Sequence, residues 1–201
     1  FAKEVHMRLI AATHNKGKVM EMQEILGELG YEVISQGDAG ISEEPEENGK
    51  TFEENALIKA RAVAKHCDCP VIADDSGLCV DALNGRPGIY SARYAPTDTE
   101  RIKKLLKELD GCENRSAKFV SAAAVVFPDG AEIAVRGEVH GTILKDPCGH
   151  GGFGYDPVFC SDELQKSFGE ASAEEKNKIS HRGRAFRNLC EVLKTHGERK
   201  E

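Results

Sequence analysis

Apolar residues in the first part of the chain follow two different spacings. Uninterrupted apolar runs at 9–12 and 71–73 are typical of buried strands, and residues 31–35 are predicted to be a further strand. After the first run, apolar positions recur every three or four residues, which predicts an amphipathic helix that ends at Gly30. Those positions are Val19, Met22, Ile25, Leu26 and Leu29.

A second helix is predicted before the apolar run at 71–73. Thr51 followed by Glu54 has the spacing of a capping box, and the alanine-rich segment after it extends to about His66. Asn55 and Lys59 are four residues apart, so they are expected to share one face of this helix.

The second half of the chain is richer in strands. Residues 98–109 have the pattern of an amphipathic helix, and they are followed by β-rich runs at 118–127 and 131–143. Pro128-Asp129-Gly130 between the two runs predicts a hairpin turn, because proline presets one backbone angle and glycine supplies a positive one.

Near the C-terminus, Ser172 with Glu175 predicts another capping box, and the last helix is expected to start near Gly183. The apolar stripe of this helix consists of Ala185, Phe186, Leu189, Cys190 and Leu193. Alternating helices and strands with an antiparallel hairpin predict an α/β fold with a mixed sheet flanked by helices. We expect two lobes with a cleft rather than two independent domains.

Composition and charge narrow the class of protein. The chain has 201 residues and a formal net charge of −7, which argues against a dedicated nucleic-acid-binding protein. It contains neither an apolar run of membrane-spanning length nor a signal-peptide pattern.

Its seven cysteines lack the spacing of zinc or redox motifs, so thiols in a reducing cytoplasm are expected, with a zinc site as the alternative. Residues 1–6 precede Met-Arg-Leu-Ile and are expected to be a cloning remnant.

Thr13-His14-Asn15-Lys16-Gly17-Lys18 connects the first strand to the first helix. A helix N-terminus presents unpaired N–H groups, Gly17 lets the backbone approach a ligand, and the two lysines add positive charge, so this segment suits phosphate. It is not a Walker loop, because the first glycine is missing and Val19 replaces the magnesium-binding Ser or Thr. A plain polar loop is the alternative.

Acidic residues cluster in two places. Asp74-Asp75-Ser76-Gly77 is expected at the C-terminal end of the buried strand, where ligands of α/β proteins bind. Carboxylate oxygens there favour magnesium or manganese. Glu46 or Glu47, from the acidic run at 43–47, can complete a metal site with Asp75. A solvated turn and a solvated charged face are the alternatives.

Two later segments carry groups that can contact a base. Residues 149–157 contain glycines that favour a tight turn or close approach to a ligand, with Phe153 as a stacking surface and Asp156 as an acceptor. Lys176 and the segment 180–183, which includes a histidine and an arginine, supply donors just before the last helix. A β-bulge and a helix cap with surface cations are the alternatives.

These segments together resemble the inosine triphosphate pyrophosphatase family, also called the Ham1-like family. The resemblance covers a single domain, residues 7–196, and is carried by six motifs in the family's order. They are Ala12-Thr13-His14-Asn15-Lys16-Gly17-Lys18, Thr51-Phe52-Glu53-Glu54-Asn55-Ala56, Ala73-Asp74-Asp75-Ser76-Gly77-Leu78, Pro87-Gly88-Ile89-Tyr90-Ser91-Ala92-Arg93-Tyr94, Gly152-Phe153-Gly154-Tyr155-Asp156-Pro157 and Ser180-His181-Arg182-Gly183. Family members often have Gly where this chain has His14, which affects only the geometry of that loop.

The resemblance implies an elongated α/β fold with a central active-site cleft between two lobes, usually in a homodimer. It implies Asp75 as the catalytic carboxylate and Glu47 and Asp75 as the magnesium ligands. It also implies substrate contacts for further residues, listed in chain order. They are Thr13, His14, Asn15, Lys16, Gly17, Lys18, Lys59, Ser76, Phe153, Gly154, Tyr155, Asp156, Lys176, His181 and Arg182.

The expected activity is magnesium-dependent hydrolysis of ITP, dITP and XTP to the monophosphate and pyrophosphate, with Mn²⁺ as a possible substitute cation. Donors from His181 or Arg182 would favour a 6-oxo purine over adenine, whose 6-amino group is itself a donor. The alternatives are a pyrimidine triphosphatase, a nucleotide sensor without turnover and a nucleic-acid-binding module. We expect a cytoplasmic enzyme with no nucleic-acid or membrane partner.

Overall fold

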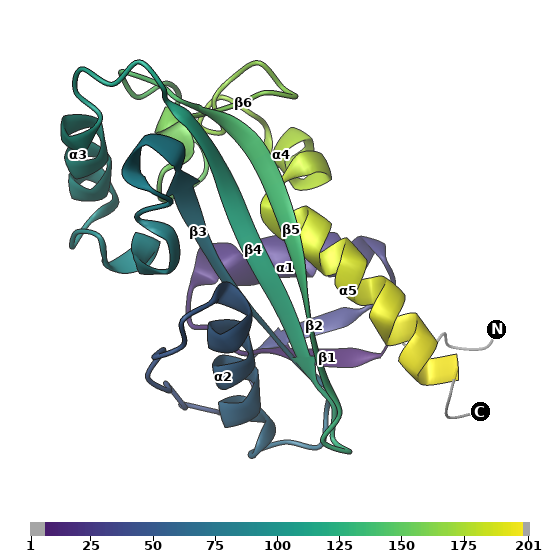
Figure 1. The fold of residues 1–201 in the computed structure, drawn as a ribbon. Coiled ribbons are helices and arrows are strands. Elements are labelled where there is room, and N and C mark those ends of the chain that lie inside the picture. Colours follow the sequence, from purple (N-terminus) through teal and green to yellow (C-terminus); the bar gives the residue numbers. More distant parts are fainter. Residues whose placement is uncertain (1–6, 199–201) are drawn as a thin grey trace. The chain divides into compact units, whose positions relative to one another are not determined.

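The computed structural model describes residues 7–198 as an α/β protein (Figure 1). The expected cloning remnant, residues 1–6, lies outside the described residues. The elements in chain order are β1 (Arg8–Ala11), α1 (Lys16–Glu28), β2 (Glu32–Ser35), α2 (Phe52–Ala64), β3 (Val71–Val80), the 3₁₀ helices η1 (Asp81–Leu83) and η2 (Gly88–Arg93), α3 (Asp98–Glu108), β4 (Ser116–Val126), β5 (Glu132–Ile143), the 3₁₀ helix η3 (Asp156–Val158), β6 (Phe159–Ser161), α4 (Ala173–Ile179) and α5 (His181–Glu198).

The six strands form one mixed sheet in the order β2-β1-β3-β4-β5-β6. β1 is parallel to both β2 and β3, whereas β5 and β6 are antiparallel. Figure 1 shows β1 and β2 side by side with α1 close to them. The predicted mixed sheet flanked by helices is confirmed.

The chain divides into two compact units, each built from separated segments. Within residues 7–198, the first unit comprises 7–75, 122–137 and 182–198, and the second comprises 76–121 and 138–181. The second unit has a core of its own, in which Phe119, Phe159 and Phe168 pack with their ring centroids 4.5–6.0 Å apart.

The sheet of the first unit is covered by helices on both faces. Leu9, Ala11 and Ile72 belong to one apolar cluster together with residues of α1 and α5. The residues next to them in the strands, Ile10, Val71 and Ala73, belong to another cluster, together with Ala60 and Val63 of α2. Since successive side chains of a strand point to opposite faces, α1 and α5 cover one face of this sheet and α2 covers the other.

β3 is longer than predicted. We expected a strand at 71–73 with Asp74-Asp75-Ser76-Gly77 beyond its end, but these residues lie inside the ten-residue strand Val71–Val80. The strand continues because both carboxylates are buried and bind cationic or amide groups of the protein, as described below.

Two helices begin earlier than predicted. α1 starts at Lys16, because the Asn15 carboxamide oxygen accepts from the backbone N–H of Lys18 and caps the helix. α5 starts at His181 rather than near Gly183. Its first turn has no acidic residue, contrary to the usual helix-dipole preference, and ion pairs of Arg182 offset that disadvantage.

One of the two predicted capping boxes is complete and the other is half formed. Ser172 and Glu175 form a complete capping box at α4. At α2, Thr51 caps the backbone N–H of Glu54, but the Glu54 carboxylate accepts from the Lys50 N–H instead of the Thr51 N–H. The capping box predicted at α2 is therefore half formed.

The remaining elements match their predictions closely. α3 and the β4–β5 hairpin lie where the periodicity placed them, and Gly130 in the hairpin turn has a φ of 87°. All five residues of the predicted α5 stripe are buried. No helix among residues 7–198 has the length and apolarity that crossing a membrane requires.

Gly77 generates a testable prediction about stability. A Cβ atom at Gly77 would lie 2.1 Å from the carbonyl oxygen of Gly88 and 2.7 Å from Ser91 Oγ. Gly77→Ala should therefore lower the free energy of unfolding by about 1–3 kcal/mol, the usual cost of overpacking. Gly27→Ala is the control, because its Cβ would meet nothing within 4 Å. Urea unfolding measures both, and equal stability of the two variants would contradict the close approach.

Candidate active site

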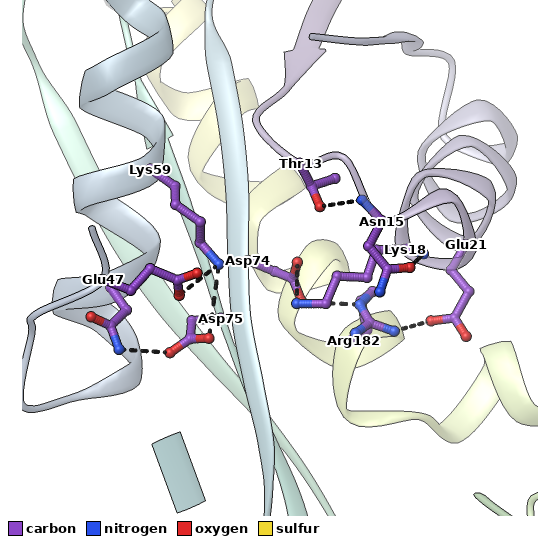
Figure 2. Close-up of polar contacts among 10 residues, drawn as sticks. Thr13, Asn15, Lys18, Glu21, Glu47, Lys59, Asp74, Asp75 and Arg182 are labelled. Carbon is purple, nitrogen blue, oxygen red and sulfur yellow. Dashed lines mark hydrogen bonds and ion pairs between the residues drawn. The ribbon is translucent and has the colours of Figure 1, made fainter. Parts of the chain in front are cut away.

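The alternation of β3 sends its two adjacent aspartates to opposite faces of the sheet. Asp74 lies two residues after Ile72, so it points to the same face, towards α1 and α5. Asp75 points to the same face as Val71 and Ala73, towards α2. Figure 2 shows the two carboxylates leaving the strand on opposite sides. The pair therefore makes two separate charge clusters instead of one.

Asp74 is the centre of a buried network on the α1–α5 face. Its Oδ2 accepts from Arg182 Nε at 3.1 Å, and its Oδ1 lies 3.3 Å from Lys18 Nζ (Figure 2). Arg182 also binds the carboxylate of Glu21 in α1. Burial by itself would raise the pKa of Asp74, but the charges of Lys18, Arg182 and Lys59 outweigh it and hold this pKa far below its usual range.

The same environment acts on the two cations. Burial would lower the pKa of Arg182, but Asp74 and Glu21 raise it above its already high value. Burial lowers the pKa of Lys18, and the attraction of Asp74 opposes this only in part. Arg182 and Asp74 are thus a fixed ion pair, whereas Lys18 is a poorly solvated ammonium group, which favours binding of an anion.

Asp75 binds residues of α2 on the opposite face. Its Oδ2 accepts from Asn55 Nδ2 at 3.1 Å. Its Oδ1 lies 3.8 Å from Lys59 Nζ, as Figure 2 shows. Glu47 Oε2 lies 3.2 Å from the same ammonium group. Burial raises the pKa of Asp75, while the charges of Lys59 and Lys18 oppose that rise. Glu47 and Asp75, 28 positions apart in the sequence, therefore converge on one cation.

Glu47 lies on an irregular segment that the rest of the first unit holds in place. The buried Gln36 side chain donates to the carbonyl oxygens of Ile41 and Glu43 at 3.2 and 2.8 Å. After Glu47, the Gly49 N–H donates to Asn55 Oδ1 at 2.8 Å. The acidic run at 43–47, for which a solvated charged face was the alternative, is thus held by hydrogen bonds near both of its ends.

The predicted phosphate segment forms the start of α1. Thr13 Oγ1 accepts from the Asn15 N–H, and Asn15 caps the helix, so these side chains shape the turn that enters α1. Lys16 is exposed, and His14 lies 3.7 Å from Glu44 of the acidic run. Gly17 and Lys18 complete the first turn of a 13-residue helix, whose N-terminal N–H groups favour an anion.

The residues near Asp75 fit a divalent cation that is held largely by its substrate. Mg²⁺ is commonly bound by one or two carboxylates together with phosphate oxygens. Glu47 and Asp75 supply two carboxylates that already face one positive charge, the Lys59 ammonium. Residues 7–198 contain no group of three or more His, Cys, Asp or Glu that can hold a metal.

The second unit brings together Phe153, Asp156 and Lys176. Lys176 Nζ lies 2.7 Å from Asp156 Oδ2 and 4.9 Å from the centre of the Phe153 ring. Asp156 Oδ2 also accepts from the Phe153 N–H at 3.0 Å. Asp156 and Lys176 are both buried, so a buried ion pair contacts the partly exposed ring of Phe153.

Glycines and hydrogen bonds fix the loop that carries this ring. Gly152 has a φ of 70°, and a Cβ there would lie 2.1 Å from Asp156 Oδ2. The Gly154 N–H donates to Asp98 Oδ2 at 2.9 Å, and the Tyr155 hydroxyl donates to the Ser91 carbonyl oxygen at 2.8 Å. These contacts hold the loop in place, where its glycines predicted a tight turn or a close approach to a ligand.

The remaining predicted residues occupy distinct positions. His181 is buried in the second unit, where its ring stacks on Phe119 with centroids 4.8 Å apart. Ser76 follows Asp75 in β3 and is partly exposed. Arg182 is buried in the first unit, with Nε and Nη1 donating to Asp74 and Glu21.

Three residues of these clusters were not among the predicted site residues: Asn55, Asp74 and Glu21. Two of them left a signal in the sequence. Asn55 shares a helical face with Lys59, and Asp74 must point away from Asp75 once the strand is known to continue through both. Glu21 gave none, because an acidic residue on an amphipathic helix is ordinarily solvated.

The Asp74 network generates a prediction about stability. Asp74→Asn leaves Arg182 and Lys18 buried without their shared carboxylate, and breaking such a pair costs about 3–5 kcal/mol. We expect a loss at the lower end of this range, because Glu21 still binds Arg182. Urea unfolding at neutral pH measures it, and a loss below about 1 kcal/mol, the scale of a surface ion pair, would contradict a buried network.

The same network predicts a pH dependence. Because the pKa of Asp74 is lower in the folded than in the unfolded state, its ionisation stabilises the protein above the unfolded value of about 3.9. This contribution is lost as the pH falls below that value towards the folded pKa. The stability difference between wild type and Asp74→Asn should therefore be constant above about pH 5 and shrink below about pH 4. A difference that is the same at pH 3.5 and pH 7 would refute the assignment.

Comparison with known proteins places this geometry in a family. The chain is 51% identical over 189 residues to the dITP/XTP pyrophosphatase of Bacillus subtilis, with 92% of this chain and 96% of that protein covered. It is 43% identical over 204 residues to the dITP/XTP pyrophosphatase of Mesorhizobium japonicum, with 92% of each chain covered.

Solved structures give the same result. The Staphylococcus aureus Ham1 protein is 41% identical, with a TM-score of 0.83 and 94% of this chain and 99% of that chain covered. A dITP/XTP pyrophosphatase from Mycobacterium abscessus is 44% identical, with a TM-score of 0.72 and 91% and 98% covered. The sequence profile of the Ham1 family matches residues 9–192. A match of this length, with relatives at this identity, shows that the chain belongs to the Ham1 family.

Proposed function

We propose that this protein hydrolyses non-standard purine nucleoside triphosphates such as ITP, dITP and XTP to the nucleoside monophosphate and pyrophosphate. The observation that carries the proposal is the convergence of Glu47 and Asp75 on Lys59, with the charge of Lys18 in the first turn of α1 also acting on Asp75. Relatives named dITP/XTP pyrophosphatase at 43–51% identity support the choice of substrate. The reaction adds one water across the bond between the α- and β-phosphoryl groups.

The phosphates would bind at the start of α1 and at the two lysines. Thr13, Asn15 and Gly17 shape a helix N-terminus whose N–H groups suit phosphate oxygens, and His14 and Lys16 border it. Lys18 and Lys59 are anchored by Asp74 and by Glu47 with Asp75, so their ammonium groups are positioned before the substrate arrives. Positioned cations stabilise the charge that develops on the leaving pyrophosphate.

Glu47 and Asp75 would hold Mg²⁺, or Mn²⁺ in its place. When bound, the cation neutralises phosphate charge and makes a nearby water more acidic. Asp75 has an acceptor oxygen, Oδ1, on the Lys59 side, while Oδ2 is taken by Asn55. This carboxylate would orient the attacking water and accept its proton.

Phe153, Lys176 and His181 of the second unit carry groups that suit a purine base. Phe153 offers a ring in contact with Lys176, which pairs with Asp156, and the hydrogen bonds of Gly154 and Tyr155 hold the loop that carries this ring. Donors from Lys176 or His181 would suit a 6-oxo group and oppose the 6-amino group of adenine. Ser76 next to Asp75 would contact the substrate. A contact of Arg182 with the base stays a prediction, as do the homodimer, the cytoplasmic location and the absence of a nucleic-acid partner.

Replacing the proposed base gives one test. Asp75→Asn keeps the size of the side chain but removes its charge, so kcat should fall by about 10²–10⁴, the range of general-base contributions. Pyrophosphate release from ITP at saturating Mg²⁺ measures it, with Glu191→Gln on the exposed face of α5 as the control. Turnover by Asp75→Asn at the wild-type rate would exclude the assigned role.

A substrate panel tests the proposed class. Pyrophosphate release from ITP, dITP and XTP should exceed that from ATP by up to about 10⁴, the discrimination that a hydrogen-bonding site achieves between donor and acceptor groups. All turnover should depend on added Mg²⁺. ATP or a pyrimidine triphosphate as the best substrate would reject the purine assignment, and binding without turnover would favour a sensor.

A further inference from the structure

Asn55 links the two carboxylates of the proposed site. It is fully buried in the first turn of α2 and uses both ends of its carboxamide. Nδ2 donates to Asp75 Oδ2 at 3.1 Å, and Oδ1 accepts from the Gly49 N–H at 2.8 Å. Gly49 is two residues after Glu47. One side chain therefore contacts the first carboxylate directly and the backbone that carries the second.

The chemistry of the neighbours fixes the orientation of this carboxamide. A backbone N–H can only donate, so the Asn55 atom that faces Gly49 must be the oxygen. An ionised carboxylate can only accept, so the atom that faces Asp75 must be the nitrogen. No other side chain of this size has a donor and an acceptor set apart in this way, and Asp, its nearest match in shape, lacks the donor.

Gly49 gives an independent sign that this contact is tight. A Cβ atom at Gly49 would lie 2.6 Å from Asn55 Oδ1 and 2.8 Å from Glu54 Cβ. The absence of a side chain at position 49 is thus required for the carboxamide to reach the backbone. This requirement is steric, because the backbone of Gly49 is outside the left-handed region.

We propose that Asn55 is a positioning residue, which sets the separation of Glu47 and Asp75 by tying Gly49 to Asp75 through its carboxamide. The proposal rests on the proposed function, because it assigns these two carboxylates to a divalent cation. By occupying Asp75 Oδ2, Asn55 leaves Oδ1 on the side of Lys59 and Glu47. Outer partners of metal-binding carboxylates affect metal affinity or activity by about 10- to 100-fold.

The link to the backbone is tested without any assay of activity. Amide hydrogen exchange at Gly49 should be faster in Asn55→Ala, which has no acceptor, than in wild type. It should stay slow in Asn55→Asp, which keeps an acceptor oxygen. Asn188→Asp is the control, and Gly49 exchange in it should match wild type. Asn188 of α5 also donates from Nδ2, at 3.1 Å to the Arg136 carbonyl oxygen, so this variant makes the same chemical change away from Gly49. Equal Gly49 exchange in wild type and Asn55→Ala would overturn the proposed tie.

The link to the cation is tested by binding and by kinetics. A titration with Mn²⁺, monitored by electron paramagnetic resonance, should show that Asn55→Ala binds Mn²⁺ about 10- to 100-fold more weakly than wild type. Asn55→Asp and Gly49→Ala should lower kcat for ITP by a similar factor, whereas Gly37→Ala, whose Cβ would lie 3.8 Å from Ser35 Oγ, should not. Mn²⁺ affinity and kcat at wild-type levels in these variants would overturn the proposal.

A double-mutant cycle separates positioning from a general effect on folding. If Asn55 positions Asp75 together with Glu47, then Asn55→Ala should lower the residual rate of Asp75→Asn by a smaller factor than it lowers the wild-type rate, because coupled residues are not additive. The same factor in both backgrounds would mean that Asn55 only supports the fold. Wild-type protein that neither binds Mn²⁺ nor releases pyrophosphate would reject the proposed function itself, whereas an active wild type with unaffected Asn55 variants rejects this proposal alone.

Discussion

The constraint on which the candidate site depends is the alternation of a buried strand that contains two consecutive acids. Within β3, Asp74 and Asp75 must point to opposite faces, and neither face offers water in bulk. Each carboxylate therefore needs its own compensating groups. α1 and α5 supply them on one face through Lys18 and Arg182, and α2 supplies them on the other through Asn55 and Lys59.

This division gives the two acids different chemistry. Asp74 is surrounded by cations and stays ionised at any ordinary pH, so it is suited to hold Lys18 and Arg182 in place. Asp75 has fewer compensating charges, and burial raises its pKa, so its environment suits proton transfer better than that of Asp74. Neighbouring residues of the same type thus differ in role because the sheet separates them.

The sequence predicted the elements well where periodicity was long, and the site less well where burial decided the outcome. α3 and the β4–β5 hairpin follow from spacing and turn residues alone. The length of β3 did not, since two acids ordinarily end a strand and only distant partners allow it to continue. The resemblance to the family implied roles for Glu47, Lys59 and Asp75, but their convergence, and the link through Asn55, depend on contacts that no local pattern encodes.

The ion pair between Arg182 and Asp74 also bears on how the chain reaches its folded state. The two residues are 108 positions apart, and Glu21 and Arg182 are 161 apart. During synthesis from the N-terminus, β3 emerges long before α5, so the face of Asp74 lacks its arginine until synthesis has passed residue 182. Emergence of α5, rather than the appearance of the strands, is thus the stage at which the first unit can complete its interior.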